Sequence, residues 1–254
     1  MTFYKIIFAS SENQYHIPSE TVQVVVTSPP YWDLKNYDNN MNQIGFNESY
    51  EFYLERMNKV WAECYRVLKS AGSLFVNINY RRNENQLLRI QDDFIRQLVK
   101  LGFIFQHKIL WHKPSGIPTA GLRLADRYEY ILHFSKNPQF FINPETSFND
   151  YKNKLPLAIY DSWRIVKKAG SIGKQFEHPA MFPDELAQRA IAIASLPNEI
   201  VLDPFLGSGT SMRAAIKAHR NCYGYEVNLG YKPLMVHRLE KEFGMFGNVE
   251  FVEK

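Results

Sequence analysis

A chain of 254 residues can bury one large core, and an α/β fold of this length is commonly a single domain. A formal charge of +4 permits an anionic partner without requiring one, and the only cysteines, Cys64 and Cys222, exclude a disulfide framework and a zinc knuckle. Because the first apolar run is too short for a signal peptide and no apolar stretch has membrane-spanning length, we expect a soluble cytoplasmic protein.

Strands and helices alternate along the first half of the chain. The apolar run VQVVVTS predicts a strand buried on both faces. Ser49 can cap the helix that follows, and apolar residues at three- and four-residue spacing carry this helix to a stop at Gly72. SLFVNINY is a second buried strand, and a helix over 86–100 comes next. The segments FIFQHKILWHK and RYEYILHFSK predict two further strands joined by a loop.

The same alternation returns near the end of the chain. A helix from Pro183 to Leu196 opens with proline and two acidic residues, and the strand NEIVLD, the helix GTSMRAAIKAHR and the strand CYGYEV follow. A helix over 231–243 comes next, and the final NVEFVEK has the pattern of an extra strand that we do not place. The alternation predicts an α/β fold with a doubly wound, mostly parallel, Rossmann-like sheet.

Residues 137–177 interrupt this alternation with weak periodicity, several turn residues and an excess of cations. One interpretation is a solvated excursion over one face of the protein, and the other is an insertion that contacts a polyanion. The composition alone leaves both open. The cations of this segment are Lys152, Lys154, Arg164, Lys167, Lys168 and Lys174.

The segment EIVLDPFLGSGT predicts a strand, a glycine-rich loop and a helix start, where a ligand can approach the backbone closely. It lacks the lysine of a Walker loop and the full dinucleotide fingerprint. Glu226 ends the next strand, where a carboxylate can accept hydrogen bonds from ribose hydroxyls or can be a plain surface charge. A nucleoside without a pyrophosphate site favours S-adenosylmethionine, with Asp203 placed for its ammonium group and the rings of Phe205 and Tyr31 near its sulfonium.

A second loop, SPPYW, follows the strand VQVVVT and faces the glycine loop across one crevice, because both loops leave the carboxyl ends of parallel strands. Prolines fix this corner, so that the Ser28 oxygen and the Pro29 carbonyl can accept both protons of an amino group while Tyr31 stacks on a planar ring. Acceptors on both N–H groups free the lone pair of the nitrogen to attack a methyl group. The alternative is that Pro29 and Pro30 only end a strand.

TSPPYW and LDPFLGSGT closely resemble motifs of the amino-methyltransferases of bacterial DNA, which modify exocyclic amines of cytosine or adenine. QIGFNESYEFYLERMNKVWAECYRVLKSAGSLFVNI, RYEYILHFSK and HPAMFPDELAQRAIAIAS extend the resemblance over most of the chain. Because the catalytic loop precedes the cofactor loop, the resemblance implies the circularly permuted β class. It divides the chain into a catalytic half (1–136), a target-recognition insertion (137–177) and a cofactor-binding half (178–254).

The resemblance also implies the residues of the site. The catalytic corner consists of Ser28, Pro29, Pro30 and Tyr31. The residues expected to bind S-adenosylmethionine are Phe182, Asp203, Pro204, Phe205, Gly207, Ser208, Gly209, Thr210 and Glu226. The residues expected to contact DNA, each of whose cations can also be a solvated surface charge, are Trp32, Lys113, Arg123, Arg127, Lys167 and Lys168. One departure is FASSEN, where members often carry Gly-Asp, so that Ser10 or Ser11 has to replace a contact to the cofactor adenine.

Serine at position 28 is the family's usual mark of N(4)-cytosine methylation, although some adenine enzymes share it. A neutral hydroxyl avoids a carboxylate beside the acceptor edge of cytosine. We therefore expect a site-specific methyltransferase that flips a cytosine out of duplex DNA in the bacterial nucleoid. The alternatives are N(6)-adenine methylation, an RNA or protein amine methyltransferase, and a non-catalytic DNA-binding module. No metal is expected, because the histidines lack ligand spacing, and a homodimer and a companion restriction endonuclease stay open.

Overall fold

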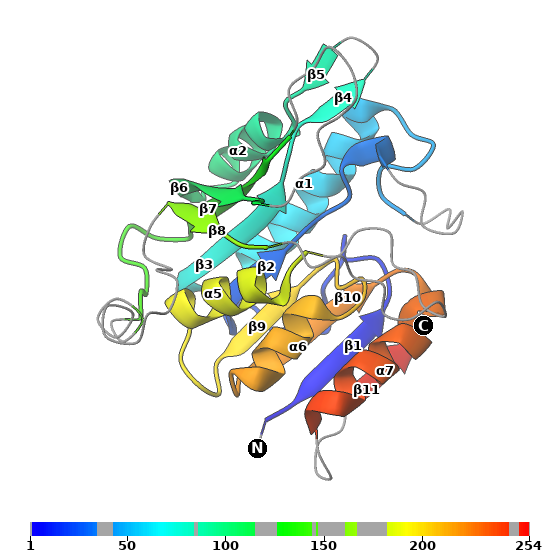
Figure 1. The fold of residues 1–254 in the computed structure, drawn as a ribbon, viewed down its shortest axis with the longest axis vertical. Helices are drawn as coiled ribbons and strands as arrows, with labels where there is room; N and C mark the ends of the chain where they lie inside the picture. The colour runs from blue at the N-terminus through cyan, green and yellow to red at the C-terminus, as the bar shows by residue number, and fades with distance from the viewer. Residues whose placement is uncertain are drawn as a thin grey trace.

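The computed structural model describes residues 2–34, 43–83, 86–114, 126–143, 146, 161–166, 182–243 and 249–253. The strands of its main sheet are β1 (Tyr4–Phe8), β2 (Val22–Thr27), β3 (Leu68–Ile78), β6 (Ile104–His112), β7 (Tyr128–Ser135), β8 (Ser162–Arg164), β9 (Ile200–Asp203), β10 (Asn221–Glu226) and β11 (Val249–Glu253). They pair in the order β11-β1-β10-β9-β2-β3-β7-β6-β8 (Figure 1). Only β7 runs antiparallel to its neighbours, β3 and β6, among the described strands of this sheet. The predicted mostly parallel, doubly wound sheet is confirmed.

Helices cover both faces of this sheet, as Figure 1 shows. One face carries α1 (Tyr50–Val67) and α2 (Ile90–Lys100), and the other carries α5 (Asp184–Ala194), α6 (Thr210–Lys217) and α7 (Lys232–Phe243). The strand β2 is buried on both sides because Val24 and Val26 pack toward α5 and α6, whereas Val22 and Val25 pack toward α1. No helix in the described part of the chain is long and apolar enough to cross a membrane.

The helix α1 forms largely as its sequence predicts. The Ser49 side chain accepts a hydrogen bond from the Phe52 amide at 3.2 Å, and the apolar face of the helix is buried. The predicted stop at Gly72 is wrong, because α1 ends at Val67 and Gly72 lies inside β3. A Cβ atom at Gly72 would lie 2.7 Å from the Leu68 side chain and 2.9 Å from the Gln23 carbonyl oxygen. Close packing within the sheet therefore explains this glycine.

Other differences concern short strands. Residues 86–88, predicted to be helical, form β5 (Gln86–Leu88), which pairs with β4 (Arg81–Asn83) in a separate antiparallel hairpin, so α2 starts only at Ile90. The segment 137–177, for which no strand was predicted, contributes β8, which adds to the sheet edge beside β6. The unplaced NVEFVEK contains β11, which pairs in parallel with β1.

The centre of the sheet is the pairing of β2 with β9, through Val24↔Val201 and Val25↔Leu202. From β2 the chain passes through α1 to β3 on one side, and from β9 it passes through α6 to β10 on the other side. The strand order therefore reverses direction between β2 and β9. Open α/β sheets bind ligands at such a switch point, outside the carboxyl ends of the strands. The loops TSPPYW and DPFLGSG both leave the sheet there.

Candidate active site

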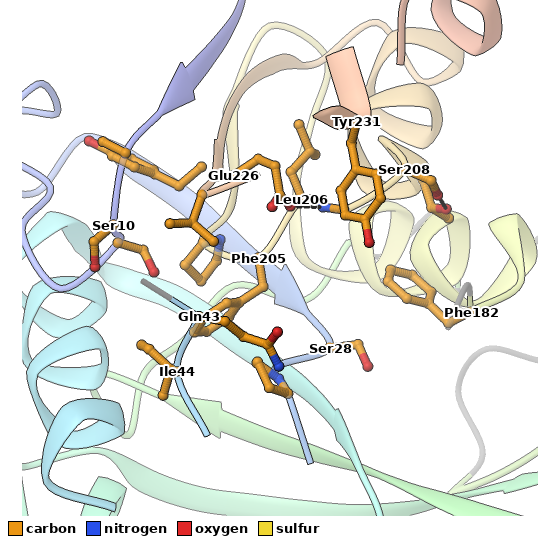
Figure 2. Close-up of a pocket in the computed structure, with 18 residues that line it drawn as sticks. Ser10, Ser28, Gln43, Ile44, Phe182, Phe205, Leu206, Ser208, Glu226 and Tyr231 are labelled. Carbon is orange, nitrogen blue, oxygen red and sulfur yellow. Dashed lines mark hydrogen bonds between the residues drawn. The ribbon is translucent and has the colours of Figure 1, made fainter. Parts of the chain in front are cut away.

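An open cavity lies at this switch point, with about 770 Å³ of empty space that includes open solvent (Figure 2). Most of its lining residues lie at or just after the carboxyl ends of β1, β2, β9 and β10. The lining consists of Ala9, Ser10, Ser11, Ser28, Pro30, Pro204, Phe205, Leu206, Gly207, Ser208, Thr210, Tyr225, Glu226 and Val227, together with Gln43, Ile44, Phe182 and Tyr231. In the view of Figure 2, Ser10 and Glu226 lie at one end of the cavity, and Ser28 and Phe182 lie at the other.

Asp203, the last residue of β9, holds the loop that follows this strand. Its carboxylate accepts hydrogen bonds from the Thr27 hydroxyl at 2.7 Å, from the Phe205 amide at 2.9 Å and from the Ser211 hydroxyl. Asp203 is fully buried and is not among the cavity-lining residues, and burial raises the pKa of its carboxyl to about 6. The structure therefore places Asp203 as a support that joins β2 to the glycine loop. The contact of Asp203 with the cofactor ammonium, which the sequence analysis expected, stays a prediction.

The glycines of the loop have backbone conformations that other residues rarely adopt. Gly207 has φ +54° and Gly209 has φ +84°, and the turn leads directly into α6. Gly207 lines the cavity, whereas Gly209 is not among the lining residues and precedes the first turn of α6. The predicted loop is therefore present, and it exposes its backbone to a ligand on the side of Gly207.

Glu226 is a carboxylate at the end of the cavity. Its oxygens accept hydrogen bonds from the amides of Gly207 and Asn228, both at 2.8 Å, and the residue is only 9% exposed. Burial raises the pKa of this carboxyl to about 7, although these amides favour its ionised form. Each carboxylate oxygen has more than one lone pair, so Glu226 can still accept bonds from hydroxyl groups of a ligand.

The corner TSPPYW forms the opposite side of the cavity. Ser28 and Pro30 line it, whereas Pro29 and Tyr31 lie outside the lining. The Pro30 carbonyl accepts a hydrogen bond at 2.7 Å from the hydroxyl of Tyr53, a fully buried residue of α1. This bond and the ring geometry of the prolines hold the corner rigidly against α1.

A polar cluster, the corner network, supports this loop and was not predicted. It consists of Ser28, Tyr31, Asn77, Lys113 and Glu129. The Asn77 amide donates to the Ser28 hydroxyl at 3.3 Å, to the Tyr31 hydroxyl at 3.3 Å and to the Glu129 carboxylate at 3.2 Å. The Tyr31 hydroxyl donates to Glu129 at 3.0 Å, and Lys113 pairs with the other oxygen of Glu129 at 3.1 Å. The network therefore joins the TSPPYW corner to β3, to β7 and to Lys113, the residue that follows β6.

The residues expected to contact DNA differ in their surroundings. The Trp32 indole donates to the Glu48 carbonyl at 3.0 Å and packs edge-on against Tyr50, so the ring is half-buried against α1. Lys113 is only 16% exposed and its charge is taken up by Glu129, which assigns it to the corner network and not to an open surface. Arg127 is exposed, and its guanidinium donates to the Pro114 carbonyl. The remaining predictions, Arg123, Lys167 and Lys168, lie outside the described residues.

Several cavity residues were not among the predicted site residues. They are Gln43, Ile44, Leu206, Tyr225, Val227 and Tyr231. Leu206 lies within the glycine-loop motif, and Gln43 and Ile44 begin a segment that carries the resemblance, but none of the three was assigned to the site. Tyr225 and Val227 flank Glu226 at a strand end, which was an available signal. Ser10 and Ser11, by contrast, line the cavity, as expected for residues that replace the Gly-Asp of the resembling family. No group of metal-ligating side chains occurs among the described residues.

These features fit S-adenosylmethionine. The buried carboxylate of Glu226 suits ribose hydroxyls, the backbone at Gly207 permits close approach, and the rings of Phe205 and Phe182 provide faces for a sulfonium or an aliphatic chain. A Rossmann-like sheet that joins such a cavity to a proline corner defines a methyltransferase. The DNA methylase family of N6 and N4 enzymes matches residues 22–237, so the chain belongs to this family. It is an S-adenosylmethionine-dependent DNA methyltransferase.

Similar proteins support this assignment. The type II methyltransferase M.MjaI of Methanocaldococcus jannaschii is 32% identical over 295 residues, which cover 100% of this chain and 97% of M.MjaI. The DNA adenine methyltransferase YhdJ of Escherichia coli is 28% identical over 88% of this chain and 78% of its own. TTHA0409 of Thermus thermophilus, solved with S-adenosyl-L-methionine, has a TM-score of 0.74 at 27% identity over 98% of both chains. The cytosine-N4-specific PvuII methyltransferase shares the fold, with a TM-score of 0.74 at 20% identity over 98% of this chain and 88% of its own.

Proposed function

We propose that the protein methylates the exocyclic N(4) amine of a cytosine flipped out of duplex DNA. The observation that carries the proposal is that Ser28, at a rigid corner, lines the same cavity as the glycine loop and Glu226. An amine held at Ser28 is thereby placed opposite the methyl donor. Unstacking the target base costs a few kcal/mol, which contacts between the protein and the DNA backbone have to offset.

The proposed roles follow from the positions of the side chains. S-adenosylmethionine supplies an electrophilic methyl group when bound. Asn77 occupies one acceptor position of the Ser28 hydroxyl, and the other remains for one amine proton. The Pro29 carbonyl accepts the second amine proton, which localises the nitrogen lone pair. Glu129 and Asn77 hold the Tyr31 hydroxyl, so that the ring has one orientation for stacking on the base.

The cofactor-binding half has a separate role. Glu226 holds ribose hydroxyls, and the segment 204–208 with Thr210 and Phe182 encloses the remainder of the cofactor. Gly209 and Asp203 act through the shape of the loop. Ser10 and Ser11, which line the cavity, replace the contact to the cofactor adenine that Gly-Asp provides in the resembling family.

Cytosine is preferred over adenine because Ser28 places a neutral acceptor beside the base. N(6)-adenine methylation is the second candidate, since the relative YhdJ is named a DNA adenine methyltransferase.

We also propose the permuted β class, because TSPPYW precedes the cofactor loop in the chain. With it go a catalytic half over 1–136, a recognition insertion over 137–177 and a cofactor half over 178–254. Arg123, Arg127, Lys167, Lys168 and Trp32 remain proposed DNA contacts.

The test is methyl transfer from labelled S-adenosylmethionine to duplex DNA, followed by digestion to nucleosides. We expect label in N(4)-methylcytosine. Label in N(6)-methyladenine alone would reverse the base assignment, and label in RNA or protein but not in DNA would replace the substrate. Binding of S-adenosylmethionine by calorimetry without transfer to any of these would indicate a non-catalytic DNA-binding module. Oligomeric state and a companion endonuclease require sedimentation and inspection of neighbouring genes.

A further inference from the structure

The hairpin of β4 and β5 stands apart from the main sheet. It pairs Arg81↔Leu88, Arg82↔Leu87 and Asn83↔Gln86, and it follows the carboxyl end of β3 (Figure 1). An isolated two-stranded hairpin is at best marginally stable in water, and Leu87 on its outer strand is 45% exposed. The hairpin therefore needs attachment to the rest of the protein, and its outer surface is open to a partner.

The attachment runs to the active site. The Arg81 guanidinium pairs with Asp33 at 3.2 Å, and Asp33 follows Tyr31 by two residues. At the base of the hairpin, the Tyr80 hydroxyl donates to Asp126, which precedes Arg127. The hairpin is thus joined both to the catalytic corner and to the segment that leads into β7. All three segments lie at the carboxyl ends of β2 and β3.

Among the described residues, cations outnumber acids at this edge: Arg81, Arg82 and Arg127 against Asp33 and Asp126. The nearby acids Asp33 and Asp126 already have partners in Arg81 and Tyr80. Within the described residues, Arg82 and Arg127 have no carboxylate partner. A guanidinium presents a planar fork of donors that matches the geometry of a phosphate group.

We propose that the β4–β5 hairpin is a DNA-backbone contact beside the flipped base, with Arg82 on a phosphate. The inference rests on the proposed entry of a base at Ser28, because only then does the duplex pass over this edge. Arg127 contacts the backbone from the neighbouring segment. The ion pair of Arg81 with Asp33 links the hairpin to the catalytic corner. A duplex bound to the hairpin is therefore coupled to the loop that receives the base.

The test compares Arg82→Ala and Arg82→Lys with the unchanged protein. Lys100→Ala serves as the control. Lys100 is an exposed cation at the end of α2, just before β6 begins, and therefore lies at the amino end of that strand and not at the carboxyl ends where the hairpin lies. Binding of a fluorescein-labelled mixed-sequence duplex is measured by anisotropy at several salt concentrations. Losing one phosphate contact lowers the slope of log affinity against log salt by about 0.9. Between about 50 mM and 200 mM salt, the affinity of Arg82→Ala should therefore fall about 3.5-fold less than that of the unchanged protein.

Arg82→Lys should keep the slope of the unchanged protein, since the positive charge remains, and Lys100→Ala should keep it as well. An unchanged slope for Arg82→Ala, with the thermal midpoint also unchanged, would overturn the hairpin contact. A reduced slope for Lys100→Ala equal to that for Arg82→Ala would also overturn it, because the effect would then reflect net charge. Failure of the proposed function has a different signature: the unchanged protein itself would transfer no label to DNA.

Discussion

The hydrogen bond between Tyr31 and Glu129 gives a sharp test of the corner network. Glu129→Gln keeps the shape of the side chain but removes the charge that accepts from Tyr31 at 3.0 Å and pairs with Lys113 at 3.1 Å. Breaking a fully buried ion pair costs about 3–5 kcal/mol, because the remaining charge has no partner. The side chains of Glu129 and Lys113 are 15% and 16% exposed, so water offsets part of this cost. We expect the free energy of unfolding to fall by about 2–3 kcal/mol.

The effect on catalysis is separated from this loss by a double-mutant cycle. A hydrogen bond to a charged acceptor contributes about 1.5–3 kcal/mol, so Tyr31→Phe and Glu129→Gln should each slow single-turnover methyl transfer about 10-fold or more. If both act by fixing the ring of Tyr31, the double variant should be little slower than either single one, with a coupling of at least about 1 kcal/mol. Rates are measured with labelled S-adenosylmethionine and saturating duplex DNA.

The matched control is Glu199→Gln. Glu199 pairs with Lys69 at 3.0 Å, at the start of β9 and away from the cavity. It should change turnover little and show no coupling to Tyr31→Phe. Additive effects of Tyr31→Phe and Glu129→Gln, within about 0.5 kcal/mol, would refute the idea that Glu129 works through Tyr31.

Three further predictions concern the cavity. Burial raises the pKa of Glu226 from 4.5 to about 7, so its contribution to stability is full below pH 4.5 and is lost as the pH rises through 7. In urea unfolding, the free energy of unfolding should therefore fall by about 3 kcal/mol over this pH range, and Glu226→Gln should remove the fall. The same variant should remove the tighter binding of S-adenosylmethionine that we expect above pH 7, where the carboxylate is ionised. Tyr53→Phe removes the bond to the Pro30 carbonyl and should cost about 1–2 kcal/mol of stability and slow methyl transfer, whereas equal turnover would show that the corner needs no such support. A Cβ at Gly224 would lie 2.6 Å from the Leu206 side chain, which lines the cavity, so Gly224→Ala should cost about 1–3 kcal/mol and weaken S-adenosylmethionine binding in calorimetry, with DNA affinity as the control.

The sequence predicted the elements whose signals are local. Ser49 caps α1 because a serine before an apolar helical stripe needs only its own helix, and β2 is buried on both faces because valines fill most of its positions. Gly72 was misread as a helix stop, since its reason is the nearness of Leu68 and of the Gln23 backbone, which no local pattern contains.

The same distinction applies to the site. The glycine loop and the proline corner carry their own motifs, and the structure brings Ser28, Phe205 and Glu226 to one cavity. The corner network carries no motif. Asn77 lies opposite Ile131 in the antiparallel pairing of β3 with β7, and Glu129 is the diagonal neighbour two residues away. That contact follows from strand order and register, which the alternation of apolar residues in RYEYILHFSK does not determine.

The position of β1 has a consequence for how the protein folds. β1 pairs with β10 through Tyr4↔Cys222 and with β11 through Tyr4↔Val249, so this strand is held by strands that are synthesised much later. Pairings between such distant segments form slowly, because a long loop has to close first. Ser10 and Ser11, which follow β1 and line the cavity, therefore reach their positions only after β10 has been synthesised. A nascent chain that stops short of Asn221 has its proline corner but no complete pocket for the methyl donor.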